Sequence, residues 1–291
     1  MKTLPTDIDA LAATMRQPEM LRMFLHAAEQ RLRVAPRDAR TLWAKAQKLR
    51  ELGDHAAAAD AYDVYCAVEP ADARGAAFAR LMRGEPDGVV ASGGAAPFLW
   101  IADFLPGADL AALWDRVEAH RSQLGASQTL SADGLRVVPS YRTSQTATAD
   151  QGLRDFLLPK IRAAMEHHRL PARFALPDLS AGRVEMQMTS HADQEFFRLH
   201  RDVGPKTPDR ALTYLLYLAR PTTRYTGGDL LLVDDDRNSF TRIRPTGNAL
   251  LFFPADRMHE VTQVFCDADD PLDARLSING WFHRSLDAPV A

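Results

Sequence analysis

The hydrophobic positions of this chain follow different patterns in its two ends. From residue 1 to about residue 85, apolar side chains recur at helical spacing among Ala, Leu, Arg and Glu. From residue 180 to 285, short runs of Leu, Val, Ile, Phe and Tyr are punctuated by Gly and Pro, which is typical of strands and turns. The change predicts an α+β chain of two domains, a helical one followed by a mainly β one.

One stretch of the helical part has the length of a repeat. Pro36 and Pro70 lie 34 positions apart, and between them come Leu42, Ala46, Leu49, Gly53, Ala58 and Tyr62. This order resembles a tetratricopeptide repeat, in which small residues let two antiparallel helices approach and Gly53 and Pro70 end them. One repeat cannot bury its own faces, so we expect helical stretches at 8–34 and 72–83, or the next domain, to complete the stack. A plain helical bundle is the alternative.

A linker is predicted at residues 86–97. The sequences Glu85-Pro86-Asp87-Gly88 and Ser92-Gly93-Gly94 break any helical or strand periodicity there. We therefore expect the helical tetratricopeptide-like domain to occupy residues 1–85 and the second domain to occupy residues 98–291.

The second domain is expected to begin with a strand at 98–104, followed by amphipathic helices at 109–124 and 151–168. Further strands separated by turns are predicted at 183–188, 195–200, 211–218, 229–233, 239–243, 249–253, 259–265 and 275–283. This many short strands favour a double-sheet jelly roll with helices packed outside it.

Composition and charge narrow the class of protein. The hydrophobic fraction of 46% and charged fraction of 25% are those of a globular chain with a sizeable core. A net charge of −3 gives no basic field, so neither nucleic acid nor a membrane is expected as a partner. Cys66 and Cys266 are isolated and read as free thiols. Without a leader-like start or an apolar run of spanning length, the expected location is cytoplasmic.

Three residues have the types and spacing of a non-haem iron site, which needs two imidazoles and one carboxylate on one face of the metal. In an extended segment, residues two apart project to the same side, so His200 and Asp202 can reach one ion while Arg201 points away. His259 follows the apolar run 249–253 and supplies a third ligand from a distant strand. His283 is the rival, because His26, His55, His120, His167 and His168 lie in predicted helices and His191 in a predicted loop.

Arg275 begins the last predicted strand, which we expect to adjoin the strand of His259. Its guanidinium offers a planar fork for a carboxylate, and Ser277 projects to the same face of the strand. A surface ion pair with Asp273 is the alternative role for Arg275.

Together these motifs resemble the prolyl 4-hydroxylase class of 2-oxoglutarate dioxygenases over roughly residues 98–284. The matching elements are His200 with Asp202, Gly227-Gly228-Asp229-Leu230, Pro245 with Gly247, Phe252-Phe253, His259-Glu260-Val261, and Arg275 with Ser277 through Trp281. The resemblance implies a double-stranded β-helix, Fe(II) as the metal, and 2-oxoglutarate and O2 as co-substrates; it also brings ascorbate into consideration. The chain departs from the pattern at Met186-Gln187-Met188, where many relatives have a tyrosine, and in an acidic insertion at 267–273.

Two more site residues follow from the resemblance alone. Tyr217 matches a tyrosine that hydrogen-bonds the distal carboxylate of the oxoacid, although its apolar surroundings also suit a core residue. Arg142, in Arg142-Thr143-Ser144, matches an element that faces the substrate, and an ordinary solvated arginine is the other interpretation.

The leading hypothesis is therefore a hydroxylase of an unactivated carbon in a prolyl or other residue of a peptide or protein, which repeat helices could help to present. A hydroxylase of a free amino acid or small metabolite is the second. A non-catalytic interaction protein with an oxygenase-like sensor domain is the third.

Overall fold

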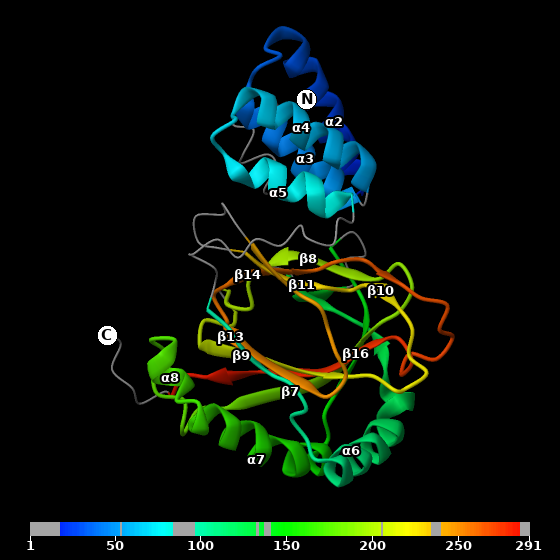
Figure 1. Ribbon diagram of the computed structural model, residues 1–291, viewed down its shortest axis with the longest axis vertical. Coiled ribbons are helices and arrows are strands. Elements are labelled where there is room, and N and C mark those ends of the chain that lie inside the picture. The colour runs from blue at the N-terminus through cyan, green and yellow to red at the C-terminus, as the bar shows by residue number, and fades with distance from the viewer. Residues whose placement is uncertain are drawn as a thin grey trace. The chain divides into compact units, whose positions relative to one another are not determined.

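The structure is a computed structural model of the 291-residue chain. It describes residues 18–285 apart from positions 53, 84–96, 132–133, 137–140, 205 and 234–239. The chain divides into two compact units, one holding the helices before residue 84 and the other most of the residues after 96 (Figure 1). The predicted linker lies almost wholly outside the described residues, so the domain boundaries stay predictions.

The first unit contains four described helices: α2 (Pro18–Val34), α3 (Ala39–Leu52), α4 (His55–Val68) and α5 (Ala73–Met82). The predicted helix pair between Pro36 and Pro70 is α3 and α4. Asp54 caps α4 by accepting a hydrogen bond of 3.1 Å from the Ala57 backbone nitrogen. Gly53 and the predicted helical residues 8–17 lie outside the described residues.

Small and aromatic side chains form the core of this unit. Ala46 on α3 and Ala58 on α4 are fully buried, as expected where two helices approach closely. The ring centroid of Tyr62 lies 5.5 Å from that of Trp43 and 5.4 Å from that of Phe78, so α3, α4 and α5 share one aromatic cluster. Packed helices are thus confirmed, whereas the tetratricopeptide assignment stays a prediction.

The second unit is built on two antiparallel sheets. The seven-stranded sheet has the order β1 (Leu99–Ile101), β13 (Ala249–Pro254), β9 (Arg210–Leu218), β16 (Arg275–His283), β7 (Val184–His191), β6 (Gln145–Thr148) and β2 (Gly125–Ala126). The five-stranded sheet has the order β12 (Phe240–Ile243), β11 (Leu230–Val233), β14 (Met258–Val261), β8 (Phe196–His200) and β5 (Arg142–Thr143). Two short pairs complete it, β10 (Thr226–Gly227) with β15 (Val264–Phe265) and β3 (Thr129–Ser131) with β4 (Gly134–Arg136).

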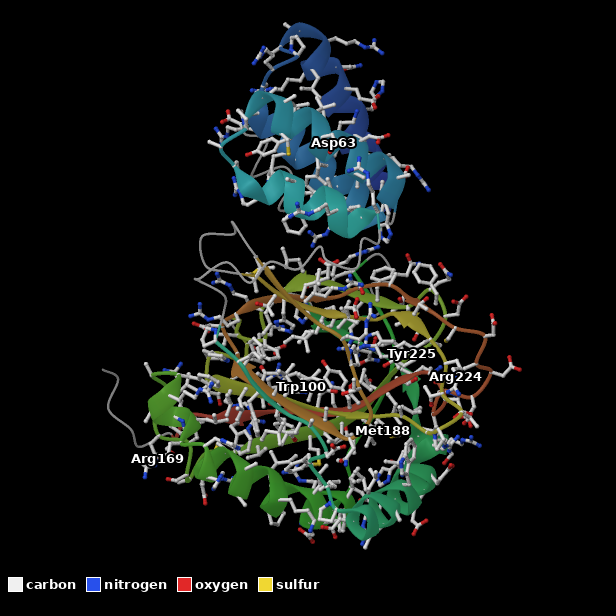
Figure 2. All side chains as sticks on the ribbon, in the orientation of Figure 1. Asp63, Trp100, Arg169, Met188, Arg224 and Tyr225 are labelled. Atoms are coloured by element: carbon white, nitrogen blue, oxygen red, sulfur yellow. The ribbon has the colours of Figure 1, made fainter. Side chains whose placement is uncertain are left out.

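Helices cover one face of the seven-stranded sheet. They are α6 (Gly107–His120), α7 (Gln151–His167) and α8 (Leu170–Arg173) (Figure 1), and the exposed 3-10 turn η1 (Arg121–Gln123) follows α6. The apolar stripe of α7, formed by Leu153, Leu157, Ile161 and Met165 at i, i+4 spacing, is buried against this sheet. Side chains fill the space between these layers, Met188 among them (Figure 2).

The other face of the seven-stranded sheet looks toward the five-stranded sheet. A second apolar cluster joins β9 and β13 of one sheet to β11, β12 and β14 of the other. Because successive strand residues alternate between faces, Val184, Met186 and Met188 of β7 pack against the helices. The side chains of the intervening residues Gln187 and Thr189 therefore point into the space between the two sheets, where they line a pocket.

Most predicted elements are confirmed, and three details were wrong. The predicted strand 259–265 is divided between β14 and β15. The strand of Arg275 does not adjoin that of His259, because β16 pairs with β7 and β9 whereas β14 pairs with β8 in the other sheet. His191 is the buried last residue of β7 rather than part of a loop. The jelly-roll topology itself stays a prediction, and among the described helices none combines the length and apolarity of a bilayer span.

Candidate metal and oxoacid site

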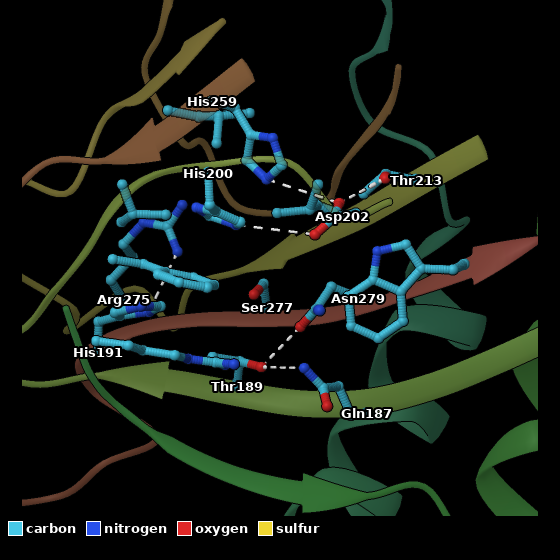
Figure 3. Close-up of a pocket in the computed structure, with 16 residues that line it drawn as sticks. Gln187, Thr189, His191, His200, Asp202, Thr213, His259, Arg275, Ser277 and Asn279 are labelled. Carbon is cyan, nitrogen blue, oxygen red and sulfur yellow. Dashed lines mark hydrogen bonds and ion pairs between the residues drawn. The ribbon is translucent and has the colours of Figure 1, made fainter. Parts of the chain in front are cut away.

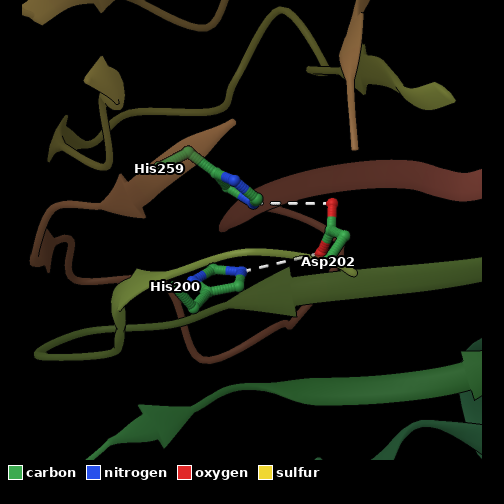
Figure 4. A group of neighbouring side chains, drawn as sticks. All are labelled: His200, Asp202 and His259. Carbon is green, nitrogen blue, oxygen red and sulfur yellow. Dashed lines mark ion pairs between the residues drawn. The ribbon is translucent and has the colours of Figure 1, made fainter. Parts of the chain in front are cut away.

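Two histidines and one aspartate converge at the end of β8 (Figure 4). His200 is the last residue of β8, Asp202 follows two positions later, and His259 pairs directly with His200 from the neighbouring strand β14. One ligand atom from each residue lies within 4.8 Å of the other two. His200 Nε2 is 3.7 Å from Asp202 Oδ1, and His259 Nε2 is 3.6 Å from Asp202 Oδ2.

The backbone fixes the orientation of both imidazoles. His200 Nδ1 lies 2.7 Å from the Arg198 carbonyl oxygen, and His259 Nδ1 lies 2.9 Å from the Arg257 carbonyl oxygen. A carbonyl can only accept, so each Nδ1 carries the hydrogen and each Nε2 keeps its lone pair. Both lone pairs are therefore available on the side of Asp202.

The cluster is shielded from water. His200, Asp202 and His259 are all buried, and the ring of Phe197 stacks on His200 at 3.5 Å between centroids. Burial, with His259 as the second cause, lowers the pKa of His200 well below its ordinary value, so this imidazole is neutral. Burial alone would raise the pKa of Asp202, but the two histidines and a hydrogen bond from Thr213 outweigh it and lower that pKa. A neutral imidazole beside a carboxylate is the form that binds a metal.

The donor set fits one divalent first-row metal. Two imidazole nitrogens and one carboxylate on one side of an ion form the facial arrangement of non-haem iron sites, which leaves other positions open. The structure thus brings together the three ligands predicted from the sequence, and Arg201 between them is exposed. The rival His283 is elsewhere, with its Nδ1 2.8 Å from Asp209 Oδ2 and its Nε2 2.9 Å from Glu185 Oε1.

A pocket between the two sheets connects this cluster with Arg275 (Figure 3). Alternate residues of two paired strands line its floor, Arg275, Ser277, Asn279 and Trp281 from β16 and Gln187, Thr189 and His191 from β7. Thr189 Oγ1 donates a hydrogen bond of 2.7 Å to Asn279 Oδ1, and Gln187 Nε2 lies 3.4 Å from Thr189 Oγ1. These side chains make the floor of the pocket polar.

Arg275 is a buried cation with no carboxylate paired to it among the described residues. It is 1% exposed. Its Nε donates to the Gly228 carbonyl oxygen at 2.5 Å, whereas its Nη2 has no hydrogen-bond partner among the described residues. Burying an unpaired charge is costly, so this geometry fits an anionic ligand such as the carboxylate of an oxoacid.

The turn before β11 sets the position of Arg275. Gly228 has φ +66°, and a Cβ added to it would lie 2.7 Å from Arg275 Cδ and 3.0 Å from Val264 Cγ2. A residue with a side chain is strained in this backbone conformation and has no room. The Gly227-Gly228 sequence therefore lets the backbone come close enough for the Gly228 carbonyl to accept from Arg275.

Tyr217 and Ser277 lie beside Arg275. The Arg275 Cζ atom is 5.3 Å from the centroid of the Tyr217 ring, and Ser277 is the cross-strand partner of Tyr217. Burial raises the pKa of Tyr217 to about 12, although the charge of Arg275 and a hydrogen bond with it act in the opposite direction. The hydroxyl is therefore neutral, and because a guanidinium can only donate, the hydroxyl hydrogen itself has no acceptor among the described residues. Ser277 lines the pocket, whereas Tyr217 is not among the residues that line it.

Arg142 reaches the pocket from β5 in the five-stranded sheet. Its guanidinium carbon lies 4.6 Å from the centroid of Phe197, and its Nε donates to Ser144 Oγ at 2.9 Å. It lines the same pocket as His200 and Asn279, as a residue facing a substrate would.

Several polar pocket residues were not predicted from the sequence, among them Gln187, Thr189, His191 and Thr213. In the first three, polar residues alternate with the apolar Met186 and Met188, a signal that predicts one non-core face of a strand. Thr213 had a weaker signal, a small polar residue beside the apolar and aromatic residues of β9. Its Oγ1 donates a hydrogen bond of 2.7 Å to Asp202 Oδ2.

Comparisons with known proteins agree with this geometry. Residues 186–283 match the model of the 2OG-Fe(II) oxygenase superfamily. An uncharacterized PKHD-type hydroxylase of Synechocystis sp. is 28% identical over 181 residues, which are 55% of this chain and 60% of the relative. The match thus spans less than two thirds of that relative's length.

Among solved structures, a prolyl-4-hydroxylase of Pseudomonas putida is similar with a TM-score of 0.47 and 22% identity, over 65% of this chain and 92% of the other. A second similar structure is a prolyl hydroxylase of Trichoplax adhaerens in complex with a hypoxia inducible factor peptide fragment. Its TM-score is 0.48 and its identity 17%, over 64% of this chain and 83% of the other. The family match includes His200, Asp202, His259 and Arg275. Residues 186–283 are thus similar to the 2OG-Fe(II) oxygenase superfamily, a class that works with Fe(II), 2-oxoglutarate and O2.

Proposed function

We propose that this chain is an Fe(II)- and 2-oxoglutarate-dependent dioxygenase that hydroxylates an unactivated C–H bond, with release of succinate and CO2. The observation that carries the proposal is the buried cluster of His200, Asp202 and His259, whose ligand atoms lie within 4.8 Å of one another. The PKHD-type hydroxylase name of the Synechocystis relative supports hydroxylation as the reaction.

In this proposal His200, Asp202 and His259 hold the iron and form its catalytic centre. Bound there, Fe(II) supplies the activation of O2 that couples oxidative decarboxylation of 2-oxoglutarate to hydroxylation. The two histidines offer Nε2 because backbone carbonyls hold their Nδ1 hydrogens. Thr213 holds the Asp202 carboxylate, and the apolar side chains of Leu215, Leu230 and Val261 in the pocket wall exclude water.

Arg275 binds the distal carboxylate of 2-oxoglutarate. Its unpaired, buried guanidinium supports this role, since an entering carboxylate would satisfy the charge. Tyr217 donates to the same carboxylate from the neighbouring strand β9. Ser277, two residues along β16 toward the metal cluster, contributes a hydroxyl to the same pocket.

The substrate proposed first is a prolyl or other residue of a peptide or protein, with Arg142 as a contact near the metal. The predicted tetratricopeptide-like repeat supports this choice, because repeat helices can bind an extended or helical segment. The polar floor of Gln187, Thr189 and Asn279 favours a second candidate, a free amino acid or another small polar metabolite. A residue set that bound no metal would instead point to a non-catalytic interaction protein.

The test is succinate formation from 2-oxoglutarate by protein loaded with Fe(II) under anaerobic conditions, measured before and after air is admitted. We expect turnover that requires Fe(II), O2 and His200, with His200→Ala as the control. Calorimetric binding of Mn(II) to the same proteins separates failed chemistry from failed metal binding. Wild-type protein that binds neither Fe(II) nor Mn(II) would refute the metal assignment.

A further inference from the structure

His191 is a buried residue of the pocket, and the proposed function assigns it no role. It ends β7 directly opposite Arg275, is 3% exposed, and lines the pocket. Its Nε2 atom has no hydrogen-bond partner among the described residues. A buried polar nitrogen is costly to leave without a partner, so an orphan of this kind points to a bound group that satisfies it.

The contact with Arg275 decides which nitrogen of His191 carries the hydrogen. Arg275 Nη1 lies 3.5 Å from His191 Nδ1, and a guanidinium can only donate, so Nδ1 is the acceptor. Burial, followed by the positive charge of Arg275, keeps the pKa of His191 well below its ordinary value. The neutral ring has a single N–H, which is therefore on Nε2.

Three buried groups that can still donate to a ligand thus lie on three adjacent strands. His191 Nε2–H belongs to β7, Arg275 Nη2 to β16, and the Tyr217 hydroxyl to β9. The strand register joins them, since Arg275 pairs with His191, and Ser277, two residues further along, pairs with Tyr217. A ligand that satisfies three donors must offer several acceptors in one place, as a carboxylate does.

We propose that His191 is a further binding residue for the oxoacid, donating from Nε2–H to the distal carboxylate that Arg275 and Tyr217 also hold. His191 also orients the guanidinium, because its Nδ1 accepts a hydrogen bond from Arg275 Nη1. The neutral imidazole of His191 thus contacts both the Arg275 guanidinium and the carboxylate of the oxoacid. The inference rests on the proposed function, because it requires 2-oxoglutarate in this pocket.

The test is the dissociation constant of 2-oxoglutarate for the full-length, Mn(II)-loaded protein, measured by titration calorimetry. His191→Phe keeps the ring shape and removes the donor, and we expect it to weaken binding at least about tenfold, as for a lost hydrogen bond to a charged group. His191→Gln keeps a donor and should restore part of the affinity. His283→Phe removes a buried histidine that does not line the pocket, and should leave the affinity within about twofold of wild type.

Mn(II) affinity separates a local effect from misfolding, since His191→Phe should bind Mn(II) as wild type does. Spectra of protein labelled with 15N-histidine give a second readout, a protonated Nε2 and an unprotonated Nδ1 for His191. Equal affinity of His191→Phe and wild type for 2-oxoglutarate, or a hydrogen on Nδ1, overturns the inference and leaves the proposed function intact. Wild-type protein that binds Mn(II) but not 2-oxoglutarate overturns both.

Discussion

Thr213 Oγ1 donates a hydrogen bond of 2.7 Å to Oδ2 of Asp202, linking the seven-stranded sheet to the residue that follows β8. Both side chains are buried. The bond restricts rotation of the carboxylate, so that Oδ1 stays 3.7 Å from His200 Nε2 and Oδ2 3.6 Å from His259 Nε2. The geometry of the proposed iron site therefore depends on a strand that contributes no ligand.

Replacing Thr213 by Val should weaken metal binding without altering the ligands. Val has nearly the same shape but no hydroxyl, so the carboxylate loses its anchor. Removing a partner that orients a metal ligand typically costs about 10- to 100-fold in metal affinity, measurable by titration with Mn(II). Thr241→Val is the matched control, because Thr241 is buried outside the pocket. Equal losses in the two variants would contradict a specific role for Thr213.

Gly228→Ala should impair 2-oxoglutarate binding through Arg275. The new Cβ would lie 2.7 Å from Arg275 Cδ in a backbone with φ +66°, so the guanidinium must move. We expect the KM for 2-oxoglutarate to rise about tenfold, the cost of roughly one charge-assisted hydrogen bond, with Mn(II) affinity unchanged. Gly125→Ala is the control, since its added Cβ would meet nothing within 4 Å. An unchanged KM in Gly228→Ala would show that the site tolerates the shift.

Two of the three metal ligands were predictable because their spacing is local. His200 and Asp202 are two residues apart in a strand-like segment. His259 comes from a distant segment, and its prediction depended on the apolar run before it and on the order of motifs in the family resemblance. The prediction that the strand of Arg275 adjoins the strand of His259 was wrong, because it depended on long-range strand pairing. In the structure β16 lies between β7 and β9, and His259 belongs to the other sheet. Which strands become neighbours depends on contacts across many residues, which periodicity does not encode.

The burial of His191 could not be predicted from the sequence for a different reason. Polar residues alternating with Met186 and Met188 are equally typical of a strand with one face in water. The structure turns that face toward another sheet, so Thr189 and His191 are buried. Only the presence of the five-stranded sheet distinguishes a pocket floor from a solvated surface, and that sheet is formed by distant segments.

The stability of the metal-free protein should fall in mild acid, in part because of His191. Its folded-state pKa lies well below the ordinary value of 6.5, with burial as the main cause. Below about pH 6.5 the unfolded chain therefore binds a proton that the folded chain does not. Stability decreases as pH falls from there toward the lowered pKa, by up to about 1.4 kcal/mol per pH unit for this group. Urea unfolding of wild type and His191→Phe should give a shallower pH dependence for the variant, and parallel curves would contradict the assignment.

Arg275→Lys tests whether the fork, and not only the charge, is required. Lysine keeps a cation but has a single ammonium group, so it cannot donate to the Gly228 carbonyl, His191 and a carboxylate in the same geometry. Burial of an imperfectly paired ammonium also opposes its charged form. We expect the dissociation constant of 2-oxoglutarate to rise by about 10- to 100-fold, as when one or two charge-assisted hydrogen bonds are lost. Mn(II) affinity should stay that of wild type, since Arg275 belongs to no part of the metal cluster. Full retention of 2-oxoglutarate affinity by Arg275→Lys would mean that a point charge is sufficient, and the proposed contacts of the guanidinium with the oxoacid would then be wrong.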